Sequence, residues 1–407
     1  MPSLAPLLPL EEARRRLLER AVPTPGETVT LADALGRVLV EPLLRAPFDV
    51  PSFANSAMDG YAVRAAETPG SLRVIGEVTP GMATLPSVEP GTTVRIMTGA
   101  PLPPGADAVV PVEAASPETA GAVTLAGATV ADHVRAAGHD TRAGDEVCIA
   151  GVLTPPKLGV LASLGLGSVV VRRRPIVAIL STGDELVEPG ERPGPNQVHD
   201  ANGVALAAAV REASGEPLVL PRARDDAAEI EQALLSAVER ADLLVTSAGV
   251  SVGRHDYVRA VLEDRGSLDF WRIAIQPGKP LAVGELGGRP LVGLPGNPVS
   301  ALVVFELFVR PFLRAMLGLA GDGRVRVRAI ATERIGKDPA RRAFLRVAVH
   351  DEAGTLRARA AGGQQSSQLR PLADANALLV VPEGADAAEP GRAYEAILLE
   401  PLAESVS

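Results

Sequence analysis

Between residues 175 and 321, short apolar runs alternate with helical patterns, and few folds accommodate this alternation. The residues of AAEIEQALLSAVERA (227–241) repeat their apolar side chains at helical spacing, and NGVALAAAVREAS (202–214) is a second helix. The apolar runs that separate such helices are predicted strands: PIVAIL (175–180), ADLLVT (241–246) and LVGL (291–294). Strands that alternate with helices predict a parallel sheet covered by helices. Ligands of such sheets bind beyond the carboxyl ends of the strands.

The remaining sequence predicts further domains around this α/β domain. Gly and Pro punctuate short β-like runs over residues 47–145, which indicates a small β-rich domain. The pattern becomes β again over 322–407, as in a small barrel or sandwich. Residues 1–46 and 146–174 mix helices with strands and are predicted to form a linking domain. The predicted fold class is therefore multidomain α/β plus β.

Composition excludes several classes of function. The chain has 407 residues and a formal net charge of −9, without a stripe of Lys and Arg, so we expect no nucleic-acid partner. Its single cysteine, Cys148, excludes internal disulfides and cysteine-rich zinc sites. No apolar run reaches membrane-spanning length, and no signal-peptide pattern is visible. We expect a cytoplasmic protein with no membrane association.

Three loops after predicted strands share small and polar residues. Because the carboxyl ends of parallel strands meet at one edge, these loops should open on the same side of the sheet. Together they offer hydroxyls, free amides and carboxylates, which suit a phosphate-bearing ligand with a divalent cation. The candidate binding residues are Ser181, Thr182 and Gly183, then Ser247, Gly249, Ser251 and Gly253, then Pro295, Gly296, Asn297, Pro298 and Ser300.

Charged residues gather near the same loops. Glu185, Asp200, Asp225 and Asp256 are carboxylates at predicted loop ends, where hard oxygen ligands suit Mg²⁺. Each is alternatively a surface acid or a helix cap, and Asp225, directly before a helix, is most open to that explanation. Lys279, in QPGKP, is predicted to contact a phosphate or another oxyanion; the alternative is an ordinary loop lysine.

A second candidate site lies far upstream. SFANSAMDGYAV (52–63) has Asp59-Gly60 at a turn, and RIMTGAP (95–101) has Thr98 after another short strand. A hairpin accounts for Asp59-Gly60, but it does not explain the polar residues before them.

These motifs, with HDANG, SAGVSVGRHDYV, QPGKPLAVG and GLPGNPVSALVVFE, occur in the order found in molybdopterin molybdenumtransferases. The chain resembles this MoeA family, which includes the gephyrin E-domain, over about residues 5–400. The resemblance implies insertion of molybdenum from molybdate into adenylylated molybdopterin, with release of AMP in a Mg²⁺-dependent step. It also implies an elongated four-domain homodimer, in which the Asp59 loop of one subunit faces the loop 295–300 of the other.

The resemblance assigns roles to individual residues. Glu185, Asp225 and Asp256 match acidic residues that the family needs for activity, as Mg²⁺ ligands and in water activation. Asp59 and Thr98 match residues that act across the dimer. Asp59 is assigned a catalytic role, as are the three acidic residues above, and Thr98 a substrate-binding role. Asp200 and Asn202, in HDANG, are counted as substrate-binding. The chain departs from the family at Ala54, where Asp is usual, and at Ala248, where a second glycine is usual; we expect Ala248 to have a negative φ, or the loop to differ.

Two other functions remain open from the sequence. The α/β domain alone is compatible with a molybdopterin adenylyltransferase, but the additional domains and the SAMDGYAV loop argue against this. A non-catalytic scaffold that binds a pterin or a peptide is the second alternative. The presence of Glu185, Asp225 and Asp256 together favours catalysis.

Overall fold

The computed structural model describes residues 7–248 and 257–402. The chain forms two compact units, which are described separately: unit 1 is Met1–Glu27 with Arg172–Ser407, and unit 2 is Thr28–Val171. Unit 2 is thus inserted into the sequence of unit 1. Within the described ranges, no helix is long and apolar enough to cross a membrane.

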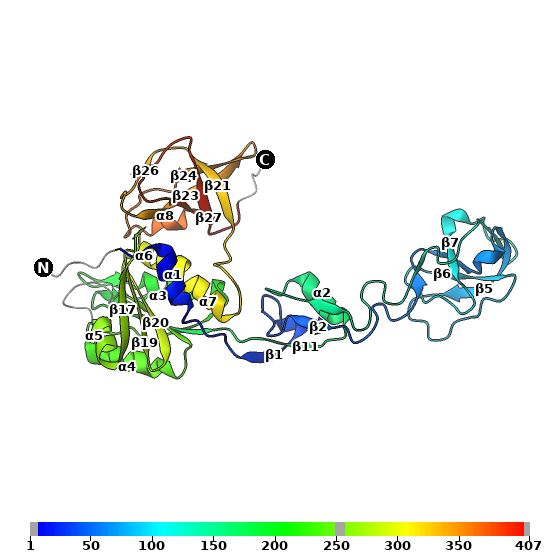
Figure 1. Cartoon of the computed structure of the whole chain (residues 1–407), viewed down its shortest axis with the longest axis horizontal. Helices are drawn as coiled ribbons and strands as arrows, with labels where there is room; N and C mark the ends of the chain where they lie inside the picture. The colour runs from blue at the N-terminus through cyan, green and yellow to red at the C-terminus, as the bar shows by residue number, and fades with distance from the viewer. Residues whose placement is uncertain (1–6, 249–256, 403–407) are drawn as a thin grey trace. The chain divides into compact units, whose positions relative to one another are not determined.

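A six-stranded sheet forms the centre of unit 1, with the order β15-β12-β16-β20-β19-β17 (Figure 1). Its strands are β12 (Ile176–Ser181), β15 (Glu216–Val219), β16 (Leu243–Ser247), β17 (Gly266–Arg272), β19 (Pro280–Leu286) and β20 (Arg289–Leu294). The predicted parallel arrangement is confirmed for β15, β12, β16 and β20, whereas β19 runs antiparallel to both neighbours. The sequence ELGGRP explains the reversal, because Gly287 and Gly288 both have positive φ and allow a tight hairpin.

Helices cover both faces of this sheet. One face carries α3 (Ala201–Glu212), α6 (Pro298–Val304), a π-helical turn (Phe305–Val309) and α7 (Arg310–Met316). The opposite face carries α4 (Ala227–Val238) and α5 (Tyr257–Arg265). The apolar residues predicted for residues 227–241 face this second core, where Ile230 and Leu234 are almost fully buried.

The N-terminal helix α1 (Leu10–Leu18) belongs to the first of these cores. Its residues Ala13 and Leu17 are fully buried, and the helix packs against α7, which is nearly 300 positions away in sequence. Figure 1 shows α1 in blue beside α6 and α7 in yellow. The amphipathic pattern predicts the helix, but nothing local in the sequence specifies this partner.

The C-terminal part of unit 1 is a closed barrel of five strands, β23-β24-β21-β27-β25, which the pairing of β23 with β25 completes. Its elements are β21 (Arg326–Ala331), β23 (Arg342–Glu352), β24 (Thr355–Ala360), α8 (Arg370–Ala373), β25 (Ala377–Val381) and β27 (Ala393–Leu398). Two-residue strands complete the unit: β13 (Leu186–Val187), β14 (Val198–His199), β18 (Ile275–Gln276), β22 (Ile335–Gly336) and β26 (Ala387–Ala388). The predicted fold class, α/β plus β with a C-terminal barrel, is confirmed.

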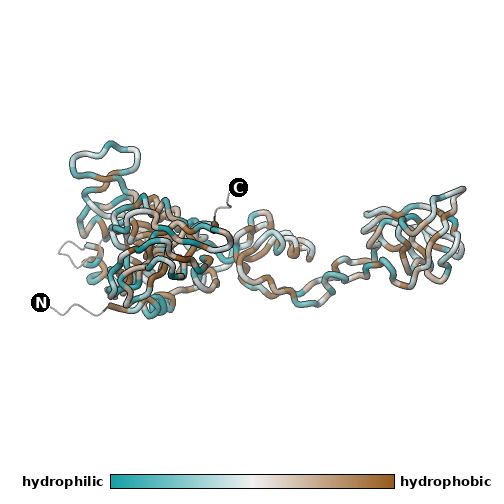
Figure 2. The backbone as a smooth tube through the Cα atoms, turned by 90° about the horizontal axis from the view of Figure 1, so that it is seen from above, coloured by the Kyte–Doolittle hydropathy of each residue, from teal (hydrophilic) through white to brown (hydrophobic). Residues whose placement is uncertain are grey.

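Unit 2 contains a five-stranded sheet of order β7-β4-β6-β5-β8 and a smaller group of strands around one helix. The sheet consists of β4 (Gly60–Val63), β5 (Gly70–Val78), β6 (Thr92–Ile96), β7 (Ala108–Pro111) and β8 (Ala122–Leu125), and β3 (Asn55–Ser56) pairs with β9 (Val134–Arg135). The smaller group consists of α2 (Pro155–Ser163), β1 (Gly26–Thr30), β2 (Leu43–Arg45), β10 (Glu146–Cys148) and β11 (Ser168–Arg172). Figure 2 shows brown, hydrophobic stretches alternating with teal, hydrophilic ones along the backbone. The four predicted domain boundaries remain predictions.

Candidate functional site

Three parallel strands of unit 1 end at one edge of the sheet, as the loop pattern predicts. Ser181 of β12 lies opposite Ser247 of β16, and Ser247 lies opposite Leu294 of β20. Beyond this edge is a cavity of about 500 Å³, here called the candidate pocket. Its lining residues are Thr182, Glu185, Leu186, Asn202, Ser247, Ala248, Pro280, Pro295, Gly296, Asn297 and Ser300.

Asn202 joins two of the three loops. It lies in the first turn of α3, and its side-chain amide donates to the Ser247 hydroxyl at 2.7 Å and to the Gly296 carbonyl at 2.8 Å. The helix is positioned by Asp200, whose buried carboxylate accepts a hydrogen bond from the Gly203 amide as its N-cap. Asn202 therefore fixes the relative positions of the β16 and β20 loops at the pocket.

The Glu185 carboxylate lies directly over the backbone of Gly183. A Cβ at Gly183 would be 2.5 Å from Glu185 Oε2, and the φ of Gly183 is +146°, so any larger residue would displace the carboxylate. The neighbouring Asp184 accepts a hydrogen bond from the Asp225 amide at 3.3 Å. This contact ties the Asp225 loop to the Glu185 loop, although the Asp225 side chain does not line the candidate pocket.

The barrel also contributes to this region. Asn297 is the N-cap residue of α6 with Pro298 as the first helical residue, but its side chain donates to the Ser366 hydroxyl at 3.1 Å instead of capping the helix. The Ser366 carbonyl accepts from the Val299 amide. Sequence reasoning missed this loop, because its polar run GGQQSSQ gives no sign of a contact 69 positions away.

Arg346 supports the same loop and was also missed. Its fully buried guanidinium donates through Nη2 to the carbonyls of Gly363 and Gln365, while its Nε and Nη1 atoms have no partner among the described residues. Burial lowers the pKa of this group. The available signal was an arginine within the apolar strand AFLRVAV. Burial of a cation costs folding free energy unless hydrogen bonds or an opposite charge compensate it.

Ala248 adopts a backbone conformation that we did not expect. Its φ is +84°, so the prediction of a negative φ at this position is wrong. Its amide donates to the Leu294 carbonyl at 3.1 Å, and its Cβ lies 3.3 Å from where a Cβ on Gly296 would be. The pairing with the β20 loop therefore holds an alanine in a region that favours glycine.

Several predicted residues lie beside the candidate pocket rather than in its lining. Ser181 is buried below it, and its hydroxyl has no hydrogen-bond partner in the described part of the chain. Lys279 immediately precedes the lining residue Pro280, and its carbonyl accepts from the Ile273 amide. Gly249, Ser251, Gly253 and Asp256 lie outside the described residues.

No group of three or more His, Cys, Asp or Glu side chains suited to a metal occurs in the ranges 7–248 and 257–402. Of the three predicted Mg²⁺ ligands, Glu185 lines the candidate pocket and Asp225 lies on the adjoining loop. Because Mg²⁺ is often bound by one or two carboxylates with waters and substrate phosphates, this donor set fits the ion.

The upstream candidate residues meet within unit 2. Asp59 Oδ1 accepts hydrogen bonds from the Thr98 amide at 2.7 Å and from the Thr98 hydroxyl at 2.8 Å. These two donors, the amide first, lower the pKa of Asp59 although its residual burial opposes the shift. The backbone of Ser56 also exchanges hydrogen bonds with Gly99 and Ala100. The two motifs thus form one loop cluster that presents an ionised carboxylate.

Comparison with known proteins covers nearly the whole chain. Three family profiles match: "MoeA N-terminal region (domain I and II)" over residues 8–165, "Probable molybdopterin binding domain" over 178–315, and "MoeA C-terminal region (domain IV)" over 328–399. The chain is 41% identical to molybdopterin molybdenumtransferase 2 of Mycobacterium tuberculosis, over 88% of this chain and 91% of the relative. It is 37% identical to molybdopterin molybdenumtransferase of Haemophilus influenzae, over 97% and 99%. The crystal structure of the molybdopterin biosynthesis MoeA protein from Pyrococcus horikoshii OT3 is similar with a TM-score of 0.81 and 29% identity, over 97% of this chain and 100% of that one.

Proposed function

Since this chain belongs to the MoeA family of molybdopterin molybdenumtransferases, we propose that it inserts molybdenum from molybdate into molybdopterin. More specifically, the substrate is adenylylated molybdopterin, and AMP is released during the reaction. The candidate pocket carries this proposal, because hydroxyls, an amide and a carboxylate converge there at the carboxyl ends of parallel strands. A tetrahedral oxyanion and a phosphate-bearing pterin both require such donors.

Each side chain has a role that follows from its position. Ser247 and Ser300 offer hydroxyls to oxyanions, and Asn202 keeps their loops at a fixed separation. Lys279 supplies a positive charge beside the pocket for molybdate or phosphate. The loop around Ser366 holds the pocket-lining Asn297 in place through its hydrogen bond.

Mg²⁺ is part of this proposal. Glu185 and Asp225, with Asp256, would hold the ion, which supplies positive charge to the phosphate oxygens of the adenylylated substrate. The absence of a side chain at Gly183 supports the assignment, because it leaves the Glu185 carboxylate room to face the pocket. Glu185→Gln should therefore lower AMP release at least a hundredfold at saturating substrate while the fold is retained.

We propose that the working form is a homodimer. Unit 2 exposes large apolar side chains, among them Leu35, Leu43 and Val170, and Val170 lines a groove of about 390 Å³. Exposed apolar side chains and a groove of this kind suit a second copy of the chain. Light scattering after gel filtration should give twice the mass of one chain, and Val170→Glu with Leu43→Glu should give the monomer.

The Asp59–Thr98 cluster would then complete the site from the partner subunit. Co-expression of an Asp59→Asn chain with a Glu185→Gln chain tests this directly. If the residues act across the dimer, each mixed dimer contains one site with neither substitution, and activity returns. If they act within one chain, every site carries a substitution and activity stays absent.

The decisive experiment measures AMP release from adenylylated molybdopterin by the purified full chain. Release that requires Mg²⁺, with active cofactor formed only when molybdate is present, is the expected result. Tight binding without release would indicate a scaffold. Formation of adenylylated molybdopterin from ATP and molybdopterin would indicate an adenylyltransferase instead.

A further inference from the structure

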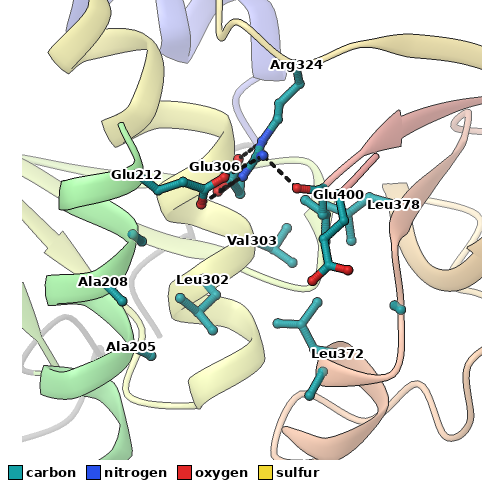
Figure 3. A pocket seen from close by; sticks show the side chains of 14 residues that line it. Ala205, Ala208, Glu212, Leu302, Val303, Glu306, Arg324, Leu372, Leu378 and Glu400 are labelled. Atoms are coloured by element: carbon teal, nitrogen blue, oxygen red, sulfur yellow. Dashed lines mark hydrogen bonds and ion pairs between the residues drawn. The ribbon is translucent and has the colours of Figure 1, made fainter. Parts of the chain in front are cut away.

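A second cavity of unit 1, about 530 Å³ in volume, lies along the same two helices that serve the candidate pocket. Helix α3 contributes Asn202 to the candidate pocket and, one and two turns later, Ala205 and Ala208 to this cavity. Helix α6 contributes Ser300 to the first and Leu302 to the second. The remaining wall comes from the barrel, so we call this cavity the junction pocket (Figure 3).

The walls of the junction pocket are mainly apolar. Alanines on α3 leave space, and the side chains of Leu302, Val303, Leu372 and Leu378 face it from three other elements (Figure 3). Its volume lies in the range of sites for small organic ligands. Burial of apolar surface would therefore supply most of the affinity for a ligand with an apolar body.

Arg324, the one lining residue of the junction pocket with a positive charge, has no donor left for a ligand. Its guanidinium makes hydrogen bonds to both oxygens of Glu306, to both oxygens of Glu212 and to the Leu399 carbonyl. A guanidinium has five N–H donors, so these five bonds use them all. Burial lowers the pKa of Arg324, but the two carboxylates outweigh it and the pKa lies above its ordinary value. An anionic ligand thus finds no free donor on this side chain.

Glu400 gives the pocket its unbalanced charge. Its carboxylate extends into the cavity on the side of Leu372 (Figure 3), and no ion pair joins it to any described residue. Glu306, in contrast, is neutralised by Arg310 and Arg324. The pocket therefore combines an apolar interior with one carboxylate whose charge is not compensated.

From these observations we propose that the junction pocket binds a small molecule with an apolar body and a single ammonium group, which pairs with Glu400. The saturated Arg324 and the charge of Glu400 select against anions, so the ligand differs in chemistry from molybdate and from a pterin phosphate. The ligand would contact α3, α6 and α8, the last of which follows the Ser366 loop by four residues. It would thereby hold the barrel against the α/β domain next to the candidate pocket.

The test compares three probes of similar shape and different charge: 2-phenylethylammonium, 2-phenylethanol and 3-phenylpropanoate. Calorimetric titration of the full chain at low salt should give saturable binding of the ammonium probe. Because the Glu400 carboxylate is exposed, the ammonium should bind about threefold to fivefold more tightly than the alcohol. The carboxylate should bind most weakly. The binding test needs no catalytic activity, so its outcome is independent of the proposed function.

Two variants and a control locate the site. Glu400→Gln should remove the preference for the ammonium over the alcohol and leave the affinity for the alcohol unchanged. Glu239→Gln, the same change on the opposite face of the sheet, should preserve the preference. Ala208→Met should fill the cavity and lower the affinity for the ammonium and for the alcohol about tenfold. The circular dichroism spectrum of this variant should be unchanged. Absence of saturable binding, equal or tighter binding of the carboxylate, or a preference that survives Glu400→Gln would each overturn the proposal.

Discussion

At the scale of single residues, the Asp59 carboxylate depends on two donors from Thr98, and their contributions can be separated. Thr98→Ala removes the hydroxyl and keeps the amide, so the pKa of Asp59 should rise but stay below its ordinary value. A carboxyl-detected NMR titration measures this shift. Asp132 offers a matched pair, since Thr129 lowers its pKa in the same way; Thr129→Ala should move Asp132 and leave Asp59 unchanged.

The same shift has a consequence for stability in acid. The pKa of Asp59 is lower in the folded chain than in the unfolded chain, so its contribution is present above about pH 4 and is lost as the pH falls through the folded pKa. Thr98→Ala should therefore reduce the stability of unit 2 at pH 5 to 7 and have progressively less effect as the pH falls through the folded pKa. An equal loss at all pH values would mean that the hydroxyl acts through packing alone.

Ala248 predicts a second measurable effect. Glycine adopts φ +84° without steric strain, so the substitution should relieve the strain at Ala248. This gain should offset the loss of stability that glycine causes by raising the conformational entropy of the unfolded chain. Ala248→Gly should thus be neutral or stabilise the chain by up to about 1 kcal/mol in urea unfolding. Ala233→Gly, in the middle of α4, should instead cost about 1 kcal/mol. A comparable loss in both variants would contradict the strain at Ala248.

At the scale of elements, the site depends on how α3 is fixed to the β16 and β20 loops. Asn202→Ala removes both hydrogen bonds of the amide, so that the Gly296 carbonyl and the Ser247 hydroxyl each lose a donor. We expect a loss of roughly 1 to 3 kcal/mol in unfolding free energy and a fall in the rate of AMP release. Ser247→Ala keeps the bond to Gly296 and should cost less. If Ser247→Ala costs as much as Asn202→Ala, the bridge to Gly296 contributes little.

Elements with a strong period could be predicted from the sequence, and so could the edge at which their loops meet. The strands that end at Ser181, Ser247 and Leu294 are short, apolar and followed by small residues, which gives both their type and their common direction. The contact of Asn297 with Ser366 could not be predicted, because a polar loop of the barrel has no hydrophobic periodicity from which its contacts could be inferred. The reversed direction of β19 was also missed, although Gly287-Gly288 is a recognisable hairpin turn.

At the scale of the whole molecule, the barrel and the α/β domain of unit 1 share a network of ion pairs in which Arg310, Arg324 and Glu306 are largely buried. Arg324 precedes the first barrel strand and pairs with Glu212 of α3 and Glu306 of the π-helical turn, which Arg310 also contacts. Arg324→Met should destabilise unit 1 by roughly 2 to 3 kcal/mol. This is less than the usual cost of removing one partner of a buried ion pair, because Arg310 still neutralises Glu306.

Arg334 provides the comparison for this prediction. It pairs with Asp386 at the barrel surface, where more than half of each side chain is exposed, so Arg334→Met should cost less than about 1 kcal/mol. Urea unfolding followed by circular dichroism measures both variants. Equal effects would show that the network around Arg324 contributes no more than a surface pair.

The insertion of unit 2 between the two segments of unit 1 also determines the order in which the chain can fold during its synthesis. Residues 28–171 are continuous and emerge before residues 172–407, so unit 2 can form its cores early. Helix α1 emerges even earlier, but its partner α7 ends only at Met316. At about 5 to 20 residues per second, the ribosome needs roughly 15 to 60 s to bridge this gap. For that time the side chains of Leu10, Ala13 and Leu17 have no core to enter, so this apolar surface stays exposed on the nascent chain.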